Sequence, residues 1–183
     1  MVNPNLLWGA LVRLAAPNPD TDAEIVARWS RDSEYHRLSD DHAAYPMPLK
    51  QAKTWLAEER TNSHPFAIRT LAGDHLIGTI GLWLPQWIHG DGWVGIGIGD
   101  REYWGKGCGT DAMKITLHYA FAELNLHRVS LSVFAHNRRA IRSYEKAGFV
   151  VEGLARHDCR RDGQYWDSVY MGILREEWEC ANA

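Results

Sequence analysis

Short apolar runs separated by turn residues alternate along the chain with stretches whose apolar residues recur at helical spacing. The apolar runs predict strands, and the segments "AGD" and "RRDGQ" between them predict hairpin turns. The predicted strands are Leu6–Leu14, Pro65–Leu71, His75–Leu84, Gly92–Gly99, Arg128–Ala135, Phe149–His157 and Tyr165–Leu174. Helical spacing and capping residues predict helices from Asp20 or Thr21 to about Arg31, from Pro48 to about Arg60, from Thr110 to about Leu124, and between Asn137 and Gly148.

The order of these elements is β-α-α-β-β-β-α-β-α-β-β, and no repeat or low-complexity linker divides them. Strands interleaved with helices predict an α/β (α+β) fold, with a mixed, mostly antiparallel sheet flanked by helices. We therefore expect residues 1–183 to form a single domain. The second predicted helix is expected to bury Ala52, Trp55 and Leu56.

Composition narrows the classes of function. The chain has 183 residues, 45% of them hydrophobic and 23% charged, with a formal net charge of −3, so it lacks the basic footprint of a nucleic-acid-binding protein. Cys108, Cys159 and Cys180 are odd in number and widely spaced, which favours a reducing cytoplasm over a disulfide framework. No leader and no apolar run of about 18 residues is evident, so we expect a cytoplasmic protein without a membrane span.

A glycine-rich stretch, "REYWGKGCGTDAM" at residues 101–113, lies between a predicted strand and a predicted helix. The stretch matches a Walker phosphate loop only incompletely, because five residues separate Gly99 from Gly105 and Gly107 follows Lys106 where Ser or Thr is required. A dinucleotide fingerprint is excluded, because Glu102 occupies the position of its third glycine. What remains is a loop whose amides and helix N-terminus can bind an anion.

This loop and the segment after it together resemble a known family. "WVGIGIGDREYWGKGCGTDAM" followed by "LHRVSLSVFAHNRRAIRSYEKAGF" resembles the coenzyme-binding core of the GNAT superfamily of N-acetyltransferases, over about residues 92–153. The resemblance extends to the branch that acetylates ribosomal-protein N-termini. In the family's loop pattern, Gln/Arg-x-x-Gly-x-Gly/Ala, Gly107 and Gly109 match, but Trp104 stands where Gln or Arg is typical.

The resemblance implies acetyl-CoA as the acetyl donor, with no metal. Ile98 and Gly99 would pair with the pantetheine arm, and Asn137 would both cap its helix and hydrogen-bond the coenzyme. Arg139 would meet the edge that carries the 3′-phosphate. The loop residues expected to hold the pyrophosphate, next to Trp104, are Gly105, Lys106, Gly107, Cys108, Gly109 and Thr110. The strand glycines Gly95, Gly97 and Gly99 would allow close approach of the coenzyme.

The resemblance also implies direct transfer, with Tyr144 as the general acid that protonates the leaving thiolate. Asp91 is the expected general base. His89, Asp74, Asp40, Asp41 and His42 are further candidates for that role. No base and orienting group accompany Cys108, so a cysteine nucleophile is not expected.

The acceptor is expected to be a primary amine that enters opposite the coenzyme. Aromatic walls are expected from Tyr45, Trp83, Trp87 and Trp93. The resemblance favours a peptide N-terminus, and a polyamine, an aminoglycoside-like amine or an amino acid stays open. Two other classes also stay open: a non-catalytic CoA-binding sensor and a nucleoside-triphosphate-binding protein. A homodimer is compatible with the sequence.

Overall fold

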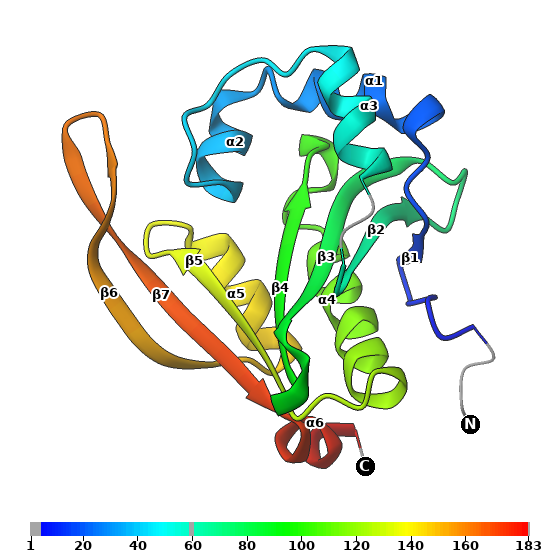
Figure 1. The fold of residues 1–183 in the computed structure, drawn as a ribbon, viewed down its shortest axis with the longest axis vertical. Coiled ribbons are helices and arrows are strands. Elements are labelled where there is room, and N and C mark those ends of the chain that lie inside the picture. Colours follow the sequence, from blue (N-terminus) through cyan, green and yellow to red (C-terminus); the bar gives the residue numbers. More distant parts are fainter. Residues whose placement is uncertain (1–4, 59–60, 183) are drawn as a thin grey trace.

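The computed structural model describes residues 5–58 and 61–182, and across them the chain forms one seven-stranded sheet with helices on both faces (Figure 1). The strands are β1 Val12–Ala15, β2 Ser63–Thr70, β3 Leu76–Gln86, β4 Asp91–Ile98, β5 Arg128–Phe134, β6 Val150–Arg161 and β7 Gln164–Leu174. The α-helices are α1 Pro19–Trp29, α2 Ser33–Ser39, α3 Leu49–Ala57, α4 Cys108–His118, α5 Arg138–Ala147 and α6 Arg175–Asn182. Two 3-10 turns, Trp87–His89 and Arg101–Tyr103, flank β4, and a π-helical turn, Tyr119–Glu123, extends α4.

The strand order is β1-β2-β3-β4-β5-β7-β6, and every neighbouring pair is antiparallel except β4 and β5. The parallel pairing covers only Asp91–Trp93 against Arg128–Ser130. Beyond that point the two strands separate, as Figure 1 shows. The edge of β4 over residues 94–98 that turns toward β5 is therefore unpaired, and it opens the sheet where the site lies. The predicted mixed, mostly antiparallel sheet is confirmed.

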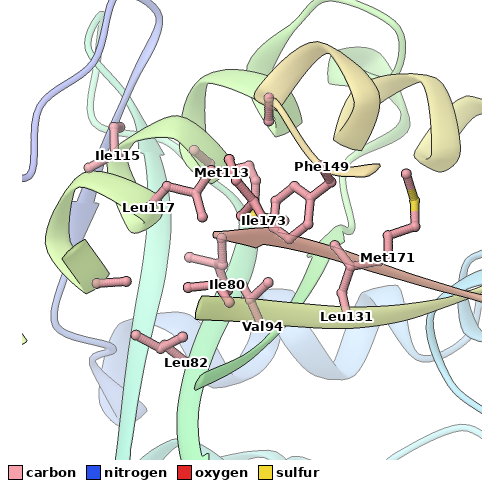
Figure 2. Close-up of a cluster of buried hydrophobic side chains, with 14 of the residues drawn as sticks. Ile80, Leu82, Val94, Met113, Ile115, Leu117, Leu131, Phe149, Met171 and Ile173 are labelled. Carbon is pink, nitrogen blue, oxygen red and sulfur yellow. The ribbon is translucent and has the colours of Figure 1, made fainter. Parts of the chain in front are cut away.

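Two apolar layers hold the sheet between helices. On one face, α4 and α5 pack on β2–β5 and β7, and Figure 2 shows Met113 and Leu117 of α4 above Ile80, Leu131 and Ile173 of the strands. On the other face, a smaller cluster joins α1 and α3 to the sheet; its buried members are Ala23, Val26, Ala27, Trp29, Ala52, Ala67 and Leu76. None of the helices in the described residues has the length and hydropathy needed to cross a membrane.

The first predicted strand, Leu6–Leu14, is wrong in its first half. The backbone N–H groups of Ala10, Leu11 and Val12 donate to the carboxylate of Asp111 on α4, at 3.1, 2.8 and 3.0 Å, so residues 9–12 curl around that side chain. A strand forms only from Val12 onward. A bond between residues a hundred positions apart leaves no local sequence signal.

Two helices were missed, α2 and α6. α2 has seven residues, none of them buried, so apolar periodicity could not reveal it. The end of the second predicted helix near Arg60 lies outside the described residues, and the helix itself, α3, ends at Ala57. Trp55 was expected in the core but is 41% exposed.

Candidate active site

The glycine loop turns into α4 through two residues with positive φ. Gly105 has φ +72° and Gly107, the N-cap of α4, has φ +85°, a region that side-chain-bearing residues rarely adopt. A Cβ on Gly105 would meet no atom within 4 Å, so the face of the loop is open. The first backbone N–H groups of α4 lack helical partners and carry the positive end of the helix dipole, so the loop can bind an anion.

A first cavity of about 300 Å³ lies between this loop, the unpaired edge of β4 and the start of α5. It contains most of the residues predicted to hold the coenzyme: Ile98, Trp104, Gly105, Gly107, Gly109, Thr110, Asn137, Arg139 and Tyr144. The strand separation that creates this cavity is a tertiary feature. The residues that line it, however, were found from the loop spacing and the family resemblance.

Trp104, the unusual residue of the loop, closes one wall of the first cavity. Its indole N–H donates to the carbonyl oxygen of Ile98 at 2.6 Å. The Arg139 guanidinium stands 3.7 Å from its ring centroid, and that of Arg101 stands 4.8 Å away. Trp104 therefore positions a cation beside the loop, where the Gln or Arg of the family pattern would supply polar groups directly.

The start of α5 forms the opposite wall. Asn137 caps the helix by accepting from the N–H of Ala140 at 3.2 Å, and its amide nitrogen donates to the carbonyl of Leu38 on α2. Thr110 and Ser143 share a hydrogen bond of 2.8 Å between α4 and α5. The structure thus assigns Asn137 a cap and a link to α2, and both α4 and α5 are fixed at the cavity.

Tyr144 lies on α5 and lines the first cavity, with its ring edge-on to Phe149 at a centroid distance of 6.2 Å. Burial raises the pKa of its phenol to about 12. The hydroxyl therefore keeps its proton throughout the neutral range. A neutral phenol beside the donor cavity can give a proton to a leaving thiolate.

Three residues predicted to hold the coenzyme lie outside the first cavity: Gly99, Lys106 and Cys108. Gly99 lies beneath Trp29, whose ring is 2.1 Å from where a Cβ would be. Cys108 is buried as the first residue of α4, and burial raises the pKa of its thiol, with Asp111 contributing. A neutral, enclosed thiol is a poor nucleophile, consistent with direct transfer.

A second cavity, of about 270 Å³, lies on the other side of β4, beneath α2 and α3. Aromatic and acidic side chains line it, among them Trp55, Phe66, Trp83, Asp40 and Glu58. Four residues line both cavities: Tyr35, Ser39, Ile96 and Gly97. The two cavities therefore meet at the middle of β4, which gives two ligands a common boundary.

The alternating glycines of β4 accommodate aromatic rings. A Cβ on Gly95 would lie 3.1 Å from the Trp83 ring, and one on Gly97 would lie 2.5 Å from the Tyr35 hydroxyl. With Trp29 over Gly99, three rings cover three glycines on one face of the strand. The glycines thus make room for the protein's own side chains on this face.

The predicted acceptor and base residues are mostly not brought together. Among the four predicted aromatic walls, Trp83 alone lines a cavity. Tyr45 is exposed beside Gln51, Trp87 is 68% exposed on its 3-10 turn, and Trp93 packs edge-on against Tyr170. These three rings lie away from the two cavities. Strand register and loop paths decide where each ring lies, and the sequence pattern does not predict them.

Asp91, the predicted general base, begins β4, seven residues before Ile98, or roughly 23 Å at 3.3 Å per residue. It lines neither cavity, and its nearest ion-pair partner is Arg128 at 3.8 Å. Among the other carboxylate candidates, Asp40 lines the second cavity.

Sequence reasoning missed the contribution of α2, including Tyr35 and Ser39. The available signal was the cap: Asp32 accepts from the N–H groups of Glu34 and Tyr35, a pattern typical of a helix start. Arg101 then ties α2 to the glycine loop, with bonds of 2.5 and 2.7 Å to the Asp32 carboxylate.

The first cavity fits coenzyme A. The open loop with positive-φ glycines suits a pyrophosphate, the unpaired edge of β4 suits an extended amide-bearing arm, and Arg139 supplies a cation.

Comparisons with known proteins agree with this geometry. A family model described as an acetyltransferase (GNAT) domain matches residues 12–150. Probable N-acetyltransferase YjcK of Bacillus subtilis (strain 168) is 36% identical over 124 residues, 66% of this chain and 67% of that protein. The spermidine N(1)-acetyltransferase of Escherichia coli (strain K12) is 40% identical over 77 residues, so the match spans 42% of this chain and only 41% of that protein.

The fold is shared with solved structures as well. The crystal structure of spermidine N-acetyltransferase from Vibrio cholerae in complex with CoA and spermine has a TM-score of 0.81 and 25% identity, covering 92% of this chain and 98% of that one. With the glycine loop, the separated strands and the family match in agreement, the chain belongs to the GNAT family of acetyl-CoA-dependent N-acetyltransferases.

Proposed function

We propose that this chain transfers the acetyl group of acetyl-CoA directly to a primary amine of a small aliphatic polycation. The observation that carries the proposal is the pair of cavities that meet at Ile96 and Gly97, one suited to the coenzyme and one lined by aromatic rings and carboxylates. Two cavities with a common boundary favour a ternary complex, in which donor and acceptor react without a covalent enzyme intermediate.

On the donor side, the amides from Gly105 to Thr110 and the Arg139 guanidinium would hold the pyrophosphate and its neighbouring phosphate. The unpaired edge of β4 would hold the pantetheine arm. Tyr144 would give its proton to the sulfur as the carbon–sulfur bond breaks, and its pKa of about 12 supports that role because the phenol is protonated before reaction.

On the acceptor side, Asp40 and Glu58 supply negative charge and Trp55, Phe66 and Trp83 supply ring faces. Burial acts to raise the pKa of Asp40, but hydrogen bonds from the His42 backbone and ring outweigh it. The net effect is a pKa below the usual value, so the carboxylate is charged at neutral pH. Carboxylates and aromatic faces together attract ammonium groups linked by methylene chains.

Release of the coenzyme thiol tests the proposal directly. Purified protein is supplied with acetyl-CoA and a panel of spermidine, diamines, monoamines, an aminoglycoside and peptides that begin with Ser, Ala or Met. We expect the highest kcat/KM with the polyamines. A preference for the peptides would replace the acceptor class, and no thiol release with any primary amine, from protein that is folded, would refute acetyl transfer altogether.

Charge removal sharpens the acceptor assignment. Asp40→Asn is expected to raise KM for the polyamine on the order of tenfold, with KM for acetyl-CoA unchanged, because a charge-assisted contact is lost on one side of β4 alone. Asp20→Asn is the matched control, since Asp20 is an exposed carboxylate paired with Lys53 on the outer surface. Equal effects of the two substitutions would indicate a general loss of charge and would contradict the assignment.

A further inference from the structure

Tyr35 occupies the boundary between the two cavities. Among the described residues, four line both cavities, and Ile96 and Gly97 bring no polar side-chain atom to that boundary. Ser39 is engaged, because its hydroxyl donates to the backbone carbonyl of Tyr35 at 2.8 Å. The Tyr35 hydroxyl, which also interacts with the Ser39 side chain, is therefore the remaining side-chain proton donor where an amine from one cavity meets a thioester from the other.

The position of this hydroxyl is well determined. It lies so close to β4 that a Cβ on Gly97 would be 2.5 Å from it. The Tyr35 ring packs edge-on against Trp29, at a centroid distance of 6.4 Å. The helix that carries it is fixed at one end by Arg101 and at the other by Asn137, which donates to the carbonyl of Leu38.

The Tyr35 phenol is also protonated and can therefore donate a hydrogen bond. Burial raises the pKa of Tyr35 to about 12, so the hydroxyl is neutral at any pH at which the enzyme would work. A neutral donor fixed in a desolvated site stabilises developing negative charge without a reorganisation cost during reaction.

We propose that Tyr35 is a second catalytic tyrosine, whose hydroxyl donates a hydrogen bond to the carbonyl oxygen of the acetyl group as the amine attacks. The inference rests on the proposed ternary-complex transfer. The nitrogen lone pair forms the new C–N bond while the carbonyl electron pair moves onto the oxygen that Tyr35 contacts. That pair then returns, the C–S bond breaks, the sulfur takes the proton of Tyr144, and the proton lost by nitrogen passes to solvent, which reprotonates Tyr144.

The two tyrosines thereby have separate tasks. Tyr144 lines the first cavity alone, on the side of the coenzyme, and moves a proton. Tyr35 lines both cavities and keeps its proton, acting only through a hydrogen bond.

Tyr35→Phe tests the assignment, because it removes one oxygen atom and keeps the ring against Trp29 and Gly97. We expect kcat to fall on the order of 100-fold, as for loss of one donor to a developing oxyanion. KM for acetyl-CoA and the calorimetric Kd of CoA are expected to stay at their wild-type values, which would also show that the variant is folded.

Tyr119→Phe is the matched control. Tyr119 also has a partly buried hydroxyl, bonded to His64 at 3.2 Å, but it lines neither cavity, so kcat should be retained. An unchanged kcat in Tyr35→Phe, or a rise confined to KM for the amine, would overturn the inference while the wild type remained active. An inactive wild type would instead refute the proposed function itself.

Discussion

Replacement of Gly107 by alanine isolates the role of backbone conformation in the glycine loop. Gly107 has φ +85° and ψ −8°, and an alanine held in this left-handed region costs about 1–2 kcal/mol. The added Cβ would meet only Leu11 Cδ1 at 3.4 Å, an ordinary contact, so the conformational cost of the backbone decides the change in stability. For a chain of this length, a loss of 1 kcal/mol lowers Tm by about 2–4 °C, so the expected decrease is about 2–8 °C.

Gly109→Ala is the internal comparison, two residues further on in the first turn of α4. Its φ is not in the left-handed region and its Cβ would lie 3.7 Å from Ile98 and Ser143. Because alanine is favoured over glycine inside a helix by about 0.5–1 kcal/mol, this variant should be more stable than the wild type. Thermal unfolding of both proteins, followed by circular dichroism, gives the answer. Equal destabilisation by the two alanines would refute the reasoning.

Three other substitutions are expected to have distinct effects. Tyr144→Phe should lower kcat about 10² to 10⁴-fold, and a pKa near 12 in the wild type predicts that its rate shows no loss of this acid between pH 6 and 10. Arg101→Gln should raise the pH midpoint of acid unfolding. Arg101 holds the pKa of Asp32 at about 2, so the pair's contribution to the free energy of unfolding is full above pH 4 and is lost as the pH falls toward 2. Arg69→Met should cost about 3 kcal/mol in a urea titration, because it leaves the carboxylate of Asp22, 1% exposed, without its partner.

A specific result would contradict each of these predictions. A basic decline of the wild-type rate that vanishes in Tyr144→Phe would show that this phenol titrates near neutrality. Arg13→Met, at a more exposed ion pair with Asp74, should cost less than about 1 kcal/mol, and a loss equal to that of Arg69→Met would show that burial does not decide the cost. An unchanged pH midpoint of acid unfolding in Arg101→Gln would show that the Asp32–Arg101 pair does not contribute to acid stability.

Most residues that line the first cavity could be named from the sequence because their signals are local. Asn137 and Gly148 bracket one helix within a dozen residues; the Asn137 side chain caps its start, and Gly148 ends it in the left-handed conformation. Gly105 and Gly107 predict a loop before α4, and their positive φ angles agree with that prediction. The strands were predicted from short apolar runs between turn residues, with boundaries displaced by a few residues, and the mixed sheet was predicted from the element order.

Apart from Trp83 and Asp40, the residues that line the second cavity could not be predicted, because they meet only through the fold. Trp55 reads as a core residue of a helix, yet it faces a cavity together with Trp83 of β3. Gly97 of β4 and Gly99 just beyond it were expected to leave room for the coenzyme, yet Tyr35 and Trp29 lie against them. α2 is too short to show an apolar period, with only Tyr35 and Leu38 on its apolar side, and polar bonds from Arg101 and Asn137 help to hold it in place.

The attachment of α2 has a thermodynamic consequence for the order in which ligands bind. The helix has no fully buried residue, although Tyr35 packs partly buried against the core; it is tied to the glycine loop through Arg101 and lines both cavities. Because Arg101 joins the loop to the start of α2, a ligand bound at the loop and a ligand in the second cavity contact elements that are directly bonded to each other. By thermodynamic linkage, if bound coenzyme raises the affinity for the amine by some factor, bound amine must raise the affinity for the coenzyme by the same factor. If binding of the two ligands is coupled, we expect the coupling to run through α2, which contacts the loop and lines both cavities.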